Sequence, residues 1–220
     1  MLEVIYSDSC AVVCVKPAGV SSEGDAGGMP GLIKEQLGAD ADVHVVHRLD
    51  KAVGGLMVYA LGSRSAAALS AQVSAREFSK TYLAVVHGCP EQKSGRYDDL
   101  LFHDSAKNMT YVVRRMRRSV REASLEYEVI AERDGTSLVK ITLLTGRTHQ
   151  IRAQFASRGM PLVGDNRYGA RDRCGIALWS YALGFSLPSG GRAGFSALPP
   201  AGYPWETFGG ELSSMPDSRV

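Results

Sequence analysis

Two short segments, far apart in the chain, carry the residue types that chemistry on a charged substrate needs. His47-Arg48-Leu49-Asp50-Lys51 places a carboxylate among cations after an apolar run. Gly146-Arg147-Thr148-His149-Gln150-Ile151-Arg152 combines two arginines with further hydrogen-bond donors. If the fold brings the two segments together, a carboxylate nucleophile gains a cationic partner and a phosphate-binding surface. This combination favours chemistry on a nucleic acid.

Asp50 is the candidate reactive group, because it follows an apolar run and precedes a segment that can turn sharply. If this segment is considered alone, a structural role for Asp50 is favoured over a reactive one, because aspartate often initiates a turn by hydrogen-bonding its own backbone. Arg152 is the candidate partner, since a sheltered carboxylate stays ionised only with a cation or several donors nearby. Spacing alone favours neither this role nor that of an ordinary surface arginine.

Further donors surround both candidates and could bind phosphate. They are His47, Arg48, Lys51, Arg147, Thr148, His149 and Gln150. The last four are predicted to lie at the amino terminus of a helix, where unpaired N–H groups favour an anion. Ordinary capping and a solvated surface explain those four about as well.

Tyr82 could stack on a flat base or move a proton, although a lone strand tyrosine usually packs in the core. The densest basic patch follows later in the chain and consists of Arg114, Arg115, Arg117, Arg118 and Arg121. On a strand, alternation would place Arg115, Arg117 and Arg121 on one face and Arg114 and Arg118 on the other. A hairpin with cations on both faces could clamp a phosphate backbone, and a solvated, exposed arm explains the patch about equally well.

The elements that must position these residues are mostly strands. Apolar runs predict strands over residues 2–6, 10–15, 43–48, 56–61, 80–87, 123–131, 137–144 and 177–187. Helices are expected from about Leu32, over residues 63–75 and from Gly146 or Thr148 to Ser157. Gly54-Gly55 is expected to break the chain, and Asp134-Gly135 to close a hairpin. Hairpin connections favour an α+β fold with a mixed, largely antiparallel sheet.

Composition bounds the class but does not identify the partner. The chain has 220 residues, 45% hydrophobic content and a formal charge of +2, which suits one globular domain over residues 1–220. Its core is expected over about 2–187, with a loosely packed tail from about 199. The four cysteines lack zinc-site spacing, and no signal peptide or membrane span is predicted. We therefore expect a cytoplasmic protein that needs no metal.

In order along the chain, these segments resemble the RluA family of RNA pseudouridine synthases. The segment from Val13 to Gly19 is similar to the first family motif, and His47 to Lys51 with Gly55-Leu56 is similar to the catalytic motif. Lys80-Thr81-Tyr82, the segment from Gly146 to Arg152, and Gly164-Asp165 with Tyr168-Gly169 are similar to the others. The resemblance spans about Leu2 to Leu187.

The resemblance implies a pseudouridine synthase catalytic domain, whose central sheet is flanked by helices and hairpin loops. The implied reaction converts uridine to pseudouridine in ribosomal or transfer RNA, without an organic cofactor. Asp50 would act as nucleophile or base, Arg152 would pair with it, and Tyr82 would stack on the uracil. Arg48 would fill the space left by the flipped nucleotide, and Arg115 and Arg117 would contact the RNA. The chain resembles the short form that lacks an amino-terminal S4-type RNA-binding module, and we expect a monomer.

One departure and two alternatives accompany this interpretation. Ala52-Val53-Gly54 replaces the more usual acidic or hydroxyl residues, which would change how the loop after Asp50 is braced. An RNA-binding or remodelling protein without catalysis is one alternative. A carboxylate-based nucleoside or glycoside hydrolase is the other, and it needs a second carboxylate, for which Asp165 is the candidate.

Overall fold

The computed structural model describes residues 1–218 and forms two compact units. The first unit comprises Met1–Lys80, Trp179–Pro199 and the chain from Met215. The second comprises Thr81–Leu178 and Pro200–Ser214. The organisation of residues 1–220 as one catalytic domain stays a prediction.

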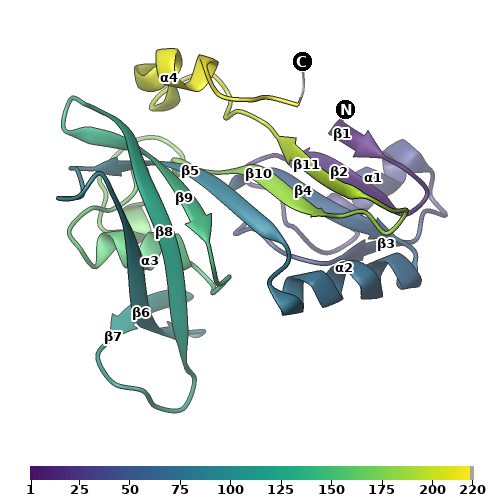
Figure 1. The fold of residues 1–220 in the computed structure, drawn as a ribbon, viewed down its shortest axis with the longest axis horizontal. Helices are drawn as coiled ribbons and strands as arrows, with labels where there is room; N and C mark the ends of the chain where they lie inside the picture. Colours follow the sequence, from purple (N-terminus) through teal and green to yellow (C-terminus); the bar gives the residue numbers. More distant parts are fainter. Residues whose placement is uncertain (219–220) are drawn as a thin grey trace. The chain divides into compact units, whose positions relative to one another are not determined.

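The first unit is built on a mixed sheet (Figure 1). Its strands are β1 (Glu3–Ser7), β2 (Ala11–Lys16), β3 (Val43–Val45), β4 (Gly54–Leu61), β10 (Leu178–Ser186) and β11 (Arg192–Ser196). They follow the order β1-β2-β4-β10, with β3 paired to β4 and β11 paired to β10. The β4–β10 pairing is parallel and the other pairings in this unit are antiparallel.

The strands predicted over residues 2–6 and 10–15 form an antiparallel hairpin, and Asp8 explains its turn. Its Oδ1 accepts hydrogen bonds from the backbone N–H groups of Cys10 and Ala11, both at 2.7 Å. This side chain therefore closes the turn between β1 and β2. All six residues of β2 are buried, so this strand lies in the core of the unit.

Two helices accompany this sheet. The helix α1 (Met29–Leu37) begins earlier than the sequence predicted, because Pro30 in its first turn suits a helix start. The helix α2 (Ser63–Ala75) has the predicted bounds and packs against β4 (Figure 1). Its Leu69 is fully buried.

The second unit contains an antiparallel sheet of five strands in the order β5-β9-β8-β6-β7 (Figure 1). The strands are β5 (Ser79–His87), β6 (Ser94–Asp104), β7 (Met109–Val113), β8 (Val120–Arg133) and β9 (Thr136–Leu143). The predicted turn at Asp134-Gly135 joins β8 to β9, and both residues have positive φ. The helix α3 (Gln150–Ala156) contacts β6 and β7. The predicted α+β class with a mixed, largely antiparallel sheet is confirmed.

The expectation of a loosely packed tail is wrong. The chain after Pro199 forms the 3-10 helix η2 (Trp205–Phe208) and the helix α4 (Gly209–Ser213). Trp205, Phe208 and Leu212 are all buried. The Gly, Pro and Ser content suggested loose packing, but a few large apolar side chains are enough to anchor a short segment. The strand β11 was also missed.

Within residues 1–218, the helices are all too short or too polar to cross a bilayer.

Candidate functional site

Asp50 lies in the irregular segment between β3 and β4, and the backbone on both sides of it is held by hydrogen bonds. The Ser22 hydroxyl accepts from the N–H of Leu49 at 3.0 Å and donates to the carbonyl of Leu49 at 2.8 Å. The N–H of Val53 donates to the carbonyl of Asp50 at 2.9 Å. The strand predicted over residues 43–48 is therefore too long: β3 ends at Val45, and Ser22, not a neighbouring strand, pairs with the backbone of Leu49.

Lys16 is buried at the end of β2 and braces the same segment. Its ammonium group donates to the carbonyls of Pro17 at 2.9 Å, Val20 at 2.7 Å and Lys51 at 3.2 Å. The N–H of Gly19 also donates to the carbonyl of Lys51, at 2.7 Å. Burial lowers the pKa of Lys16 to about 8, while the negative charge of Asp50 acts in the opposite direction. A buried cation with three carbonyl partners thus fixes the residue that follows Asp50.

His47 supports this segment from inside the first unit. Its Nε2 accepts the N–H of Val58 at 3.2 Å, and the side chain is buried. Burial, followed by the charge of Lys80, lowers the pKa of His47 well below its usual value. The imidazole is therefore neutral, with its proton on Nδ1. We propose that His47 positions the loop, which differs from the direct RNA contact that the sequence suggested.

Arg48 and Lys51 flank Asp50 on the outside. Both side chains are exposed, and Arg48 Nη1 lies 3.2 Å from Glu23 Oε1. A surface ion pair of this kind contributes little and is easily exchanged for another anion. Both residues are therefore accessible for the contacts expected of them, which stay predictions.

Gly54 and Gly55 belong to β4, so the expectation that they break the chain is wrong. Gly55 has φ of 114°, and a Cβ atom there would lie 2.4 Å from the carbonyl oxygen of Ser180 on β10. At Gly54 a Cβ atom would lie 2.5 Å from the Trp179 ring. Glycine is needed at both positions because β10 lies very close to the first residues of β4. These residues follow directly after the segment that carries Asp50.

Arg152 is the centre of a buried cluster in the second unit. Its Nε and Nη2 donate to the two oxygens of Asp165 at 2.7 and 2.8 Å. The exposed fractions of the two side chains are 5% and 1%, so the bidentate pair is sheltered from water. The guanidinium also stacks over the Tyr168 ring, 4.9 Å from its centre. Asp165 is therefore a support for Arg152, which argues against its use as the second carboxylate of a hydrolase.

Tyr168 links this cluster to the neighbouring turn. The 3-10 helix η1 (Asn166–Tyr168) follows Asp165 directly, and the N–H of Tyr168 donates to the carbonyl of Asp165. The Tyr168 hydroxyl accepts the N–H of Thr110 at 2.7 Å and lies 3.0 Å from His149 Nδ1. The motif Gly164-Asp165 with Tyr168-Gly169 thus builds the cradle of Arg152.

The turn before α3 differs from the expected helix. The helix starts at Gln150, so Arg147 and Thr148 lie outside it, and His149 adopts a left-handed conformation. Gln150 is buried, and its Oε1 accepts the N–H of Arg147 at 3.0 Å while its amide donates to Ser124. These bonds fix the backbone of the turn. We therefore propose that Gln150 positions Arg147 and does not itself contact the RNA. His149 is also buried, whereas Arg147 and Thr148 are exposed.

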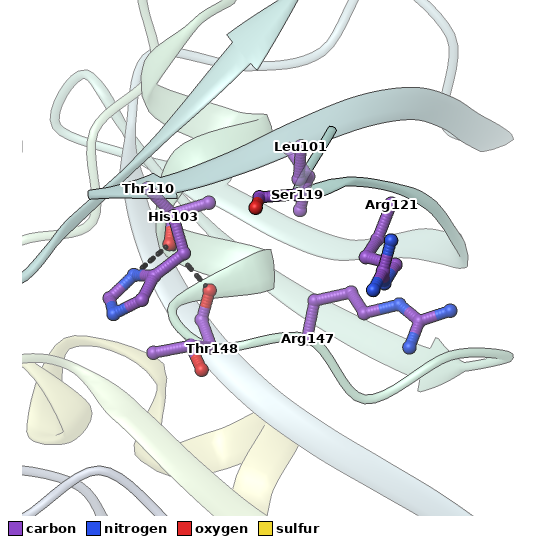
Figure 2. Close-up of a pocket in the computed structure, with 7 residues that line it drawn as sticks. All are labelled: Leu101, His103, Thr110, Ser119, Arg121, Arg147 and Thr148. Atoms are coloured by element: carbon purple, nitrogen blue, oxygen red, sulfur yellow. Dashed lines mark hydrogen bonds between the residues drawn. The ribbon is translucent and has the colours of Figure 1, made fainter. Parts of the chain in front are cut away.

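The basic patch lies in a loop and not on a strand. Residues 114–119 connect β7 to β8, and we call this segment the basic loop; it projects from the end of the hairpin (Figure 1). Alternation between two strand faces therefore does not apply to Arg114, Arg115, Arg117 or Arg118, which are all exposed. Arg117 covers the Phe102 ring at 5.0 Å. Arg121 is on β8 and borders a cavity together with Arg147 (Figure 2).

Tyr82 lies on β5, opposite Ile141 of β9, and only 6% of it is exposed. It belongs to the second unit with Arg152, whereas Asp50 belongs to the first. The structure therefore assembles a braced loop around Asp50 and, separately, a buried cradle around Arg152. The pairing of Asp50 with Arg152 and the stacking role of Tyr82 stay predictions.

Metal-ligand side chains do not gather in this fold as far as the described chain extends. No group of three or more His, Cys, Asp or Glu residues in 1–218 is placed to hold a metal ion. The four cysteines are unpaired thiols, and burial raises the pKa of Cys14 to about 12.

Comparison with known proteins decides the family. The sequence profile described as RNA pseudouridylate synthase matches residues 11–157, which include Asp50, Tyr82 and Arg152. The chain belongs to the RNA pseudouridylate synthase family. The resemblance to RluA-type enzymes is confirmed by a Vibrio cholerae relative, the dual-specificity RNA pseudouridine synthase RluA. It is 33% identical over 76% of this chain and 68% of its own length.

Other relatives have the same family name. An RNA pseudouridine synthase of Haemophilus influenzae is 32% identical, over 76% of this chain and 74% of its own length. The synthase YhcT of Bacillus subtilis is 30% identical, and the match covers 58% of its length. The chain thus spans little more than half of that relative.

A solved structure has the same fold. Human RNA pseudouridylate synthase domain containing 4 superposes with a TM-score of 0.78 at 23% identity, covering 98% of this chain and 95% of the other. The fold is therefore that of a pseudouridylate synthase domain, as the sequence predicted.

Sequence reasoning missed two supporting residues. Lys16 was noted only as part of the first family motif, although a lysine that closes an otherwise apolar run must find carbonyl partners if the run is buried. Ser22 carried no signal, since an isolated serine in a glycine-rich segment is common. Both emerge only from the folded positions of Leu49 and Lys51.

Proposed function

We propose that this protein isomerises specific uridines to pseudouridine in structured RNA. The observation that carries the proposal is the family match over residues 11–157, which contains all three residues assigned to catalysis. The braced backbone around Asp50 supports it, because a reactive carboxylate must be held in a fixed geometry to act on a bound nucleotide.

In the proposed reaction the bond from C1′ of the ribose to N1 of uracil breaks and the base turns while bound. A bond from C1′ to C5 then forms, C5 loses its proton and N1 gains one. Asp50 acts on the sugar, either by attack at C1′ or by removal of a sugar proton. Both routes need an ionised carboxylate, for which Arg152 is the proposed partner. Tyr82 is assigned to stack on the uracil and assist proton transfer from C5.

The nucleotide must leave its stack to reach Asp50, which costs a few kcal/mol. We assign Arg48 to the space that the nucleotide vacates, and Lys51, Arg115, Arg117, Arg147 and Thr148 to the RNA backbone. The names of the relatives point to the substrate class: one is a ribosomal large subunit synthase and another has dual specificity. We therefore propose ribosomal or transfer RNA as substrate, for a monomer acting in the cytoplasm.

The test is deletion of the gene in its host, followed by pseudouridine mapping across all stable RNAs. At least one modified uridine should disappear, and the wild-type gene should restore it. Asp50→Asn should fail to restore it while the purified variant keeps its affinity for RNA. Asp40→Asn is the matched control, since Asp40 is an exposed aspartate in the segment before β3.

The outcomes separate the alternatives. Restoration by Asp50→Asn would reject the assigned chemistry. An unchanged map after deletion, with RNA binding intact, would support a non-catalytic RNA-binding protein. Release of free uracil from RNA by the purified protein would indicate a hydrolase.

A further inference from the structure

A cavity of about 120 Å³ lies entirely within the second unit, between the end of the β6–β7–β8 hairpin and the turn before α3 (Figure 2). Its polar lining residues are His103, Thr110, Ser119, Arg121, Arg147 and Thr148. A water molecule takes up roughly 30 Å³ in the liquid, so the cavity has room for a small oxyanion.

Two arginines border the same end of this cavity, and His103 lies at the other end (Figure 2). Arg121 Nη1 donates to the carbonyl of Val120 at 3.2 Å, and Arg147 Nε donates to the carbonyl of Glu122 at 3.0 Å. Within residues 1–218, neither guanidinium has a carboxylate within 4.0 Å. These two backbone bonds anchor the arginines and leave further N–H donors on each. Two like charges held together in this way favour a bound anion.

Two further hydroxyls of the lining can donate to an anion, whereas Thr110 and His103 bond within the protein. The Thr110 hydroxyl donates to the carbonyl of Thr148 at 2.8 Å, so its oxygen must accept from His103 Nδ1, 3.0 Å away. His103 therefore carries a proton on Nδ1. The hydroxyls of Ser119 and Thr148 take no part in these bonds, which leaves both able to donate. No acidic side chain is among the lining residues.

We propose that this cavity binds one backbone phosphate of the RNA strand, with Arg121 and Arg147 as its two cationic donors. The assignment of the anion to RNA rests on the proposed function. The basic loop adjoins the cavity and carries four more exposed arginines, a distribution that fits a polyanion better than an isolated ion. Arg121 thereby gains a specific role within the basic patch.

The test measures binding without turnover, so that it does not depend on the isomerase reaction. A fluorescein-labelled oligouridine is titrated with the Asp50→Asn protein at several potassium chloride concentrations. Arg121→Gln and Arg147→Gln, made in this background, should each weaken binding about tenfold. Each should also lower the slope of log K against log salt by about 0.7. The double variant should bind about as weakly as either single one, because both arginines hold the same phosphate.

Arg64→Gln is the matched control, since Arg64 is an exposed arginine of α2 that lies outside both the cavity lining and the basic loop. It should change affinity less than twofold, and its effect should add to that of Arg121→Gln. Equal, additive losses for all three variants would overturn the proposal in favour of a diffuse basic surface. Unchanged RNA affinity, together with weaker binding of inorganic phosphate or of polyglutamate by the Arg121→Gln protein, would assign the cavity to a free anion or an acidic protein. Failure of the pseudouridine test would leave these binding results interpretable.

Discussion

Replacing Asp165 by asparagine tests whether the cradle of Arg152 depends on a buried charge pair. The substitution keeps the shape of the side chain but removes its charge and one of its two acceptor oxygens. Arg152 Nε and Nη2 each donate to Asp165, and both side chains are almost fully buried. Removing one partner of such a pair costs about 3–5 kcal/mol, and the remaining amide oxygen places Asp165→Asn near 3 kcal/mol.

For a chain of this length, a loss of about 3 kcal/mol lowers the melting temperature by roughly 6–12 °C. Thermal unfolding followed by circular dichroism measures this shift. Asp134→Asn is the matched control, because Asp134 is exposed in a turn with φ of 50°, which asparagine adopts readily. That variant should melt with the wild-type protein.

The Asp165→Asn variant should also lose activity at temperatures where it is fully folded. If Arg152 serves the reaction, a guanidinium displaced by about 1 Å costs roughly a hundredfold in rate. A double-mutant cycle with Arg152→Met should give a coupling free energy of at least about 1.5 kcal/mol. An Asp165→Asn protein that melts with wild type, or a cycle with no coupling, would refute the argument that this pair supports the site.

Two further predictions concern the first unit. Burial lowers the pKa of Lys16 from 10.5 to about 8. As pH rises through about 8, the ammonium group loses a proton and no longer has a donor for each of its three carbonyl partners. The value of kcat/KM should therefore fall over this range. Between pH 8 and 10.5 Lys16 is protonated only in the unfolded chain, so the free energy of unfolding should rise with pH over this window. The 13Cε resonance of Lys16 reports its titration, and a midpoint near 10 would contradict both expectations. Gly55→Ala should lower the free energy of unfolding by about 2–4 kcal/mol, because its Cβ would meet the Ser180 backbone. Gly135→Ala also has positive φ but faces open space, so urea denaturation should show a loss of only about 1 kcal/mol.

Features set by local chemistry could be predicted from the sequence. The hairpin between β1 and β2 depends on one aspartate that bonds two neighbouring N–H groups, and the turn at Asp134-Gly135 depends on its own backbone preference. The helix α2 follows from an alanine-rich run that begins after a glycine. These signals need no knowledge of distant residues.

Features set by distant contacts could not be predicted in the same way. Asp165 was noticed as part of a motif, but nothing in the spacing indicated that its carboxylate holds Arg152. The basic loop could not be told from a strand, so a hairpin and a solvated arm stayed equal alternatives, because alternation cannot distinguish a strand from an irregular connection of similar length. The tail was misjudged because composition averages over Trp205 and Phe208, whose burial decides its packing.

The departure at Ala52-Val53-Gly54 is explained by how the loop after Asp50 is braced. Lys16 and Gly19 both bond the carbonyl of Lys51, and Ser22 bonds the backbone of Leu49. These braces act on main-chain atoms, so they do not require acidic or hydroxyl side chains at residues 52–54. The requirement falls instead on the donors, which lie at the end of β2 and in the segment that follows it. Substituting Lys16 or Ser22 should therefore disturb the position of Asp50 more than restoring a threonine at Ala52 would improve it, and a comparison of kcat across these variants tests that order.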